Sequence, residues 1–180
     1  IRLSANSIRA THRGEFDDAR ALLDAVKERA EQLKPARADH PRVYFGGYVE
    51  DALKEYVEAS ATLAFIEGGD LPSQAELDVG AAPYLNGLAE AASELRRFIL
   101  DSLRRSDFSR CEELLGVMDE VYTLLVTMDY PDAVTRGLRR TTDALRGVLE
   151  RTRGDLTLAL RQQSLERRLA AFEERVGEGG

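Results

Sequence analysis

Four glutamates occur in pairs on two segments that otherwise have the composition of buried helices. The segment "EYVEASATLAF" (55–65) carries Glu55 and Glu58 among small and apolar residues, and "GLAEAASELRRF" (87–98) carries Glu90 and Glu94. Residues three or four apart lie on one side of a helix, so each pair forms an acidic strip. We call Glu55, Glu58, Glu90 and Glu94 the four glutamates.

The chemistry open to two such strips is the binding of a divalent metal ion. Mg²⁺ and Mn²⁺ are hard cations that bind carboxylates and water, and helical bundles build metal sites from carboxylates at these spacings on neighbouring helices. A metal held there could activate a water molecule and neutralise a phosphate. The plainer interpretation is that each strip is a solvated face opposite an apolar stripe. Spacing alone does not decide between them, because it does not show that the strips face each other.

Two pairs of arginines near these strips are candidates for nucleic-acid binding. Arg96 and Arg97 closely follow Glu94, and Arg104 and Arg105 end the same predicted helix. Arginine can bind a phosphate through two parallel hydrogen bonds. Arginine pairs are also common on solvated surfaces, so both interpretations stay open.

Other kinds of catalytic centre have little support in the sequence. The chain has two histidines, His12 and His40, which is too few to predict a zinc site, and we expect His12 to make a contact at a helix end. Cys111 is the single cysteine, and without a nearby histidine it is a poor candidate for a nucleophile. No phosphate-binding or dinucleotide-binding glycine motif is present.

The hydrophobic pattern predicts helices throughout the chain. Apolar residues recur with a period of about 3.6, and no segment alternates with a period of two. We expect a single domain over 1–180, an all-α bundle of six to seven helices with a long C-terminal helix. The predicted helices are 1–13, 15–34, 41–67, a short one at 73–78, 83–105, 108–128 and 132–172.

Turn signals set the limits of these helices. Pro35 is expected to stop the second helix, which leaves "PARADHP" (35–41) as a loop, and Asp107 is expected to cap the fifth. "DYPD" (129–132) predicts a turn before the last helix, and "VGEGG" (176–180) a frayed tail. The last helix would span about 60 Å. Its row of leucines leads us to expect that part of it packs against another subunit.

The composition is that of a soluble, acidic, globular protein. Apolar residues make up 43% of the chain and charged residues 32%, and the net charge is −7. This charge argues against a protein that coats DNA through a basic surface. No apolar run approaches the roughly 20 residues of a membrane span, so no membrane partner is expected. The single cysteine and the lack of a secretory-type start lead us to expect a reducing, cytoplasmic location.

Landmarks along most of the chain resemble the translin superfamily, which contains translin and translin-associated factor X. "IRATHRGEF" (8–16) is similar to the end of the family's first helix, and "KEYVEASATLAFIE" (54–67) to the "EYVEA" pattern of factor X. "YLNGLAEAASELRRFILDSLRRSDFSR" (84–110) resembles a "YL-x-G" opening, a "SEL" or "GEL" segment and a turn of the Ser-Asp-Phe-Ser type. The helix from 131 resembles the family's long final helix. The match is closest to the factor X branch and suggests an archaeal or other prokaryotic-type member.

The resemblance implies a role for each of the four glutamates. Glu55 and Glu58 align with the two glutamates of "EYVEA", Glu90 with an aspartate of the fourth long helix, and Glu94 with the glutamate of "GEL". In factor X these positions are catalytic and bind metal. By contrast, "RVYFGGY" (42–48) is nearly neutral where translin has a basic segment, which weakens the case for DNA binding of the translin type.

The implied function is that of an endoribonuclease dependent on Mg²⁺, with Mn²⁺ as a possible substitute. It would act on single-stranded or short RNA inside a hollow homo-oligomer, expected to be an octamer, which a paralogous subunit could join. A lumen of this kind is wet, so glutamates facing it would have the sequence pattern of a solvated surface. The alternative is a non-catalytic scaffold of the translin type that binds single-stranded RNA or DNA. A purely structural helical oligomer is a third interpretation.

Overall fold

Helices form all the regular structure in residues 1–177, the part of the chain that the computed structural model describes. No strand occurs in this range, so the predicted all-α fold with a long C-terminal helix is confirmed. The elements are α1 (Arg2–His12), α2 (Phe16–Asp39), α3 (Pro41–Tyr44), α4 (Gly47–Glu67), α5 (Gln74–Leu77), α6 (Ala81–Arg104), α7 (Cys111–Val126), α8 (Asp132–Thr135) and α9 (Leu138–Gly177).

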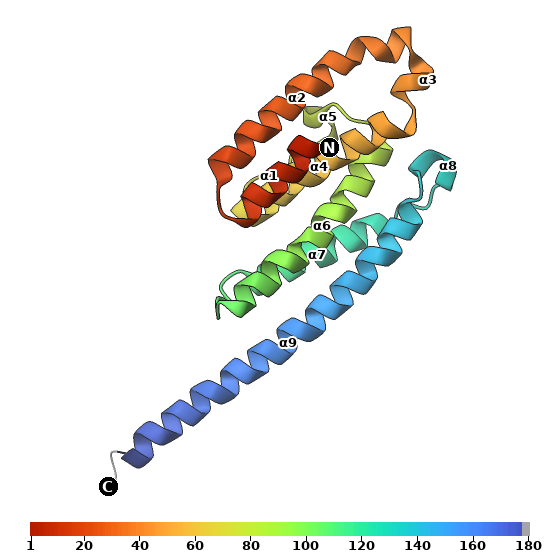
Figure 1. Ribbon diagram of the computed structural model, residues 1–180. Helices are drawn as coiled ribbons and strands as arrows, with labels where there is room; N and C mark the ends of the chain where they lie inside the picture. Colours follow the sequence, from red (N-terminus) through yellow and green to blue (C-terminus); the bar gives the residue numbers. More distant parts are fainter. Residues whose placement is uncertain (178–180) are drawn as a thin grey trace.

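The two central helices of the bundle are α4 and α6, which pack against each other (Figure 1). Helices α1 and α2 cover α4, whereas α7 and α9 cover the other side of α6. Apolar residues on α6, α7 and α9 form the larger part of the core, including Leu88, Leu95, Ile99, Leu114, Met118, Leu145 and Leu149. A smaller cluster joins α2 to α4 through Val26, Leu53, Tyr56 and Val57.

Gly87 allows α4 and α6 to approach closely. A Cβ atom at this position would lie 2.6 Å from the Cβ of Val57 and 2.7 Å from the backbone oxygen of Lys54. These distances are shorter than any normal contact, so a residue with a side chain would push the helices apart. The close approach sets the rotation and spacing of the two helices that carry the four glutamates.

Two predicted limits in the first half of the chain are wrong. Helix α2 continues through Pro35 to Asp39, so "PARADHP" is largely helical rather than a loop. The backbone carbonyl that proline leaves unpaired lies in an exposed segment, where water can satisfy it. The predicted helix 41–67 is divided into α3 and α4. Gly46 adopts an extended conformation between them, and a Cβ there would lie 3.0 Å from the oxygen of Val43.

The second half of the chain shows three further differences. Asp107 does not cap α7, which begins at Cys111; its carboxylate instead accepts hydrogen bonds from the backbone and hydroxyl groups of Ser109. The predicted helix 132–172 is divided into α8 and α9, because Arg136 and Gly137 both have positive φ angles, 52° and 82°. Helix α9 then continues to Gly177, and the rest of the predicted frayed tail lies outside the described residues.

Helix α9 is longer than the bundle that it covers. Leu138, Leu145, Leu149 and Leu156 are buried, but beyond them the helix extends away from the other elements (Figure 1). The exposed apolar residues of this extension are Leu158, Leu165, Leu169, Phe172 and Val176. Among the described helices, none combines the length and the apolar character needed to cross a membrane.

Candidate active site

The four glutamates lie close together on the facing sides of α4 and α6. Gly87 precedes Glu90 by about one turn, and a Cβ on it would meet Val57, the residue next to Glu58, so this close contact of the helices lies beside the cluster. The negative charges of Glu90, Glu55 and Glu94 all act on the carboxyl group of Glu58. All four side chains are only partly exposed. The structure therefore brings together two strips that the sequence could only place on separate helices.

Glu58 has the most strongly altered acidity in the cluster. Burial raises the pKa of its carboxyl group to about 8, and the charges of Glu90, Glu55 and Glu94 act in the same direction. The nearby Lys54 opposes this shift only in part. Without a bound cation, Glu58 is therefore protonated at neutral pH.

Lys54 is a cation within the cluster that the sequence did not single out. Its Nζ lies 2.7 Å from the Oε1 of Glu90. Burial by itself would lower the pKa of Lys54, but the hydrogen bond to Glu90 and the charges of Glu90, Glu55 and Glu58 raise it above its ordinary value. The spacing of Lys54 and Glu58, four residues apart on one helix, is the sequence signal that could have placed this lysine in the site.

His12 contacts the cluster from the end of α1. Its Nε2 lies 2.8 Å from the Oε2 of Glu94, and its side chain is only 4% exposed. This hydrogen bond is the main reason why the pKa of Glu94 is below its ordinary value, even though burial opposes the shift. The other ring nitrogen, Nδ1, is buried without a hydrogen-bond partner among the described residues. The expected helix-end contact of His12 is thus a contact with the candidate site.

The predicted nucleic-acid-binding arginines do not form one surface. Arg96 binds α9 through Asp155, at 2.8 Å, and Thr152, at 3.2 Å. Arg97 is exposed, and its charge helps to lower the pKa of Glu94. Both Arg104, which pairs with Asp101 at 3.4 Å, and Arg105 are exposed. Because they follow Glu94 by ten or more residues, they lie about 15 Å along the helix from it.

The donor set of the cluster suits Mg²⁺ or Mn²⁺, since it consists of carboxylates. The side chains are not arranged as a closed metal site, because no three His, Cys, Asp or Glu residues in the described part of the chain are placed to hold one ion. Instead, Lys54 pairs with Glu90, His12 is hydrogen-bonded to Glu94, and the raised pKa of Glu58 favours its protonated form. A cation bound by all four glutamates would have to replace the proton and draw Glu90 away from Lys54.

Comparison with known proteins shows relatives over most of the chain. An uncharacterized protein of Methanocaldococcus jannaschii is 31% identical over 163 residues, which are 90% of this chain and 72% of that protein. No family model matches the sequence.

Solved structures share the same fold. AfC3PO, which has also been solved in a complex with duplex RNA, superimposes with a TM-score of 0.82 at 36% identity, over 89% of this chain and 83% of that chain. NeC3PO, at 22% identity, has the same fold with a TM-score of 0.79. C3PO proteins are of the translin and translin-associated factor X type. This chain therefore belongs to the translin superfamily.

Proposed function

We propose that this chain is a divalent-cation-dependent endoribonuclease that cuts single-stranded or short RNA and works as a homo-oligomer. The observation that carries the proposal is the convergence of the four glutamates at the contact of α4 and α6, where burial first and the neighbouring negative charges second raise the pKa of Glu58 to about 8. Carboxylates with strongly raised pKa values are concentrated at catalytic sites.

RNA is the substrate class that the comparisons support. AfC3PO, at 36% identity, has been solved in complex with duplex RNA. Short duplexes therefore belong among the substrates to be tested, together with the single strands that the sequence leads us to expect. The net charge of −7 makes RNA binding depend on local cations and on a divalent metal ion.

The four glutamates would hold the metal ion and orient the attacking water. Mg²⁺, when bound, supplies charge neutralisation at the scissile phosphate and makes water more acidic. Glu58 would have to release its proton when the metal ion binds, because a carboxylate binds a metal in its ionised form. His12 keeps Glu94 in place and ionised, and Lys54 provides a positive charge beside Glu90.

A non-catalytic RNA-binding scaffold of the translin type is the second candidate. It is favoured by two contacts within the cluster, the hydrogen bond of His12 with Glu94 and the ion pair of Lys54 with Glu90, which provide partners for two of the carboxylates without any metal. The two candidates differ in one property, which is whether a bound RNA is cut.

A ribonuclease assay on labelled RNA separates these functions. The substrates are a single strand of about 20 nucleotides and a short duplex of the same sequence, each with Mg²⁺, with Mn²⁺ and with EDTA. The variants Glu58→Gln and Glu90→Gln keep the size of the side chain but remove its charge. Cleavage should fall by about a hundredfold or more in both, because metal-held charge contributes several kcal/mol to phosphate cleavage.

Glu120→Gln is the matched control, since Glu120 lies on the exposed side of α7. It should cut RNA like the wild type. If the two cluster variants also cut like the wild type, the glutamates are not catalytic. If the wild type binds RNA but never cuts it with either metal, the scaffold function replaces the proposed one.

A further inference from the structure

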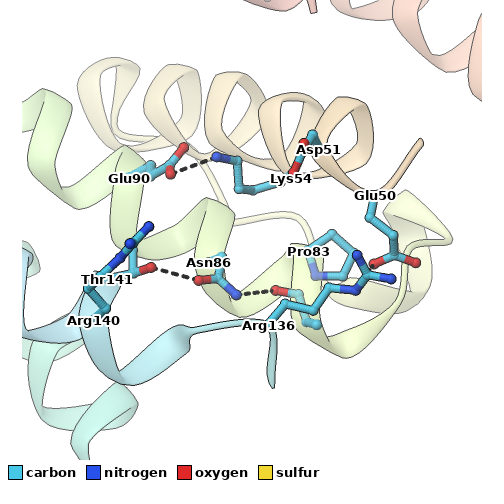
Figure 2. A pocket seen from close by; sticks show the side chains of 10 residues that line it. Glu50, Asp51, Lys54, Pro83, Asn86, Glu90, Arg136, Arg140 and Thr141 are labelled. Carbon is cyan, nitrogen blue, oxygen red and sulfur yellow. Dashed lines mark hydrogen bonds and ion pairs between the residues drawn. The ribbon is translucent and has the colours of Figure 1, made fainter. Parts of the chain in front are cut away.

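A polar pocket of about 190 Å³ opens directly beside the four glutamates. Its walls come from α4, α6 and the junction of α8 with α9 (Figure 2). It shares Lys54 and Glu90 with the candidate active site. It adds two cations, Arg136 and Arg140, and two carboxylates, Glu50 and Asp51. A site that binds metal and cuts a polyanion needs further groups to hold the chain on either side of the cut, and this pocket lies where such groups would be used.

The α8–α9 junction is held in place by Asn86. This buried residue of α6 donates a hydrogen bond from Nδ2 to the backbone oxygen of Thr135, at 2.9 Å. Its Oδ1 accepts a hydrogen bond from the hydroxyl of Thr141, at 2.8 Å (Figure 2). The two contacts lie on either side of the sharp turn between α8 and α9. The position of the arginines relative to α6 is therefore built into the fold.

Arg136 is already anchored within the protein. Its guanidinium donates a hydrogen bond to the backbone oxygen of Phe45, at 2.7 Å, and its Nε lies 3.7 Å from the carboxylate of Glu50. The left-handed backbone conformation of Arg136, with φ of 52°, is what ends α8 at this position. Arg136 thus contributes positive charge from a fixed position.

Arg140 is an exposed residue, and unlike Arg136 and Arg139 its guanidinium makes no ion pair or hydrogen bond with any described residue. The adjacent Arg139 does not line the pocket and pairs with Asp129 at 3.3 Å. Figure 2 shows the side chain of Arg140 extending along the pocket wall in the direction of Glu90. A free guanidinium in a pocket beside a proposed phosphate-cleaving centre is suited to bind a second phosphate.

We propose that the pocket binds a backbone phosphate of the RNA substrate next to the one at the four glutamates, with Arg140 as its main ligand. Arg136 and Lys54 provide supporting positive charge from the other walls. The inference rests on the proposed function for the location of the cut, but the phosphate contact itself requires only that the chain binds RNA.

The first test measures RNA affinity by fluorescence anisotropy. The probe is a labelled RNA strand of about 12 nucleotides, measured in EDTA and, in a Glu58→Gln background, with Mg²⁺. Arg140→Gln should weaken binding by about tenfold. It should also make the slope of the logarithm of affinity against the logarithm of salt concentration shallower by about one. Arg139→Gln is the matched control and should change affinity by less than about twofold. Equal losses in the two variants would overturn the assignment of Arg140.

The second test finds which phosphate Arg140 contacts. One phosphate at a time is replaced by a neutral methylphosphonate, and each RNA is titrated against the wild type and Arg140→Gln. At the contacted position the substitution should weaken binding to the wild type but cause no further loss in the variant. Additive losses at every position would overturn the proposal. Because the readout is binding, it stands even if the protein proves not to cut RNA.

Discussion

At the scale of single residues, the raised pKa of Glu58 predicts how the stability of the protein changes with pH. Its pKa is about 8 in the folded protein and about 4.5 in the unfolded chain. Between these two pH values the folded protein keeps a proton on Glu58 that the unfolded chain has lost. Stability therefore falls as the pH rises through this window, because the unfolded state releases the proton more easily. Removing the carboxylate in Glu58→Gln should abolish that loss.

The measurement is a thermal melt in EDTA at about pH 5 and about pH 9. Near pH 9 the variant should melt roughly 5–10 °C above the wild type, because the penalty is of the order of a few kcal/mol. Near pH 5 the two should be similar. If the wild type melts at a higher temperature than Glu58→Gln near pH 9, then Glu58 does not lie among like charges in the metal-free protein.

At the scale of elements, the contact between α4 and α6 at Gly87 determines whether the glutamates meet. In Gly87→Ala the new methyl group would collide with Val57 and with the backbone of Lys54, which cannot move away without shifting the helix. We expect a loss of stability of about 1–3 kcal/mol and a large loss of RNA cleavage, since the two acidic strips separate.

Gly116→Ala is the control for this change. Gly116 lies within α7, and a Cβ there would meet no atom within 4 Å. This variant should gain about 0.5–1 kcal/mol, because alanine favours the helix over glycine. Urea unfolding of the two variants checks the prediction, and a gain of stability in both would show that α4 and α6 are not closely packed at Gly87.

At the scale of the whole molecule, the extension of α9 indicates assembly. Leu158, Leu165, Leu169, Phe172 and Val176 are each more than half exposed, and at 100° per residue they fall within an arc of about 60°. A continuous apolar stripe of this kind is typical of an interaction surface. Light scattering should therefore give a mass several times the 20.0 kDa of one chain.

The stripe itself can be tested with Leu165→Gln combined with Leu169→Gln. This double variant should have a lower mass than the wild type at the same concentration. Arg167→Gln combined with Glu174→Gln, on the opposite side of α9, should leave the mass unchanged. A wild type that is a monomer at micromolar concentration would contradict both the oligomer and the enclosed site.

The helices were predictable from the sequence because the signal for a helix is local. The 3.6-residue pattern placed every long helix, including the 40-residue α9. Three of the wrong limits fall at Pro35, Gly46 and the α8–α9 junction, where the course of the chain depends on solvent and on contacts with distant residues. Arg136, for example, is held by the backbone of Phe45, which lies 91 residues away in the chain.

The sequence by itself placed Glu55 with Glu58 and Glu90 with Glu94, because spacing of three or four residues determines which side chains share a helix face. It could not show that the two faces meet, since the rotation of one helix against another is set by packing, here at Gly87. Only the tertiary structure added Lys54 as the partner of Glu90 and His12 as the partner of Glu94. His12 and Glu94 are 82 residues apart, and no local pattern relates residues that are joined only by the packing of α1 beside the central helices.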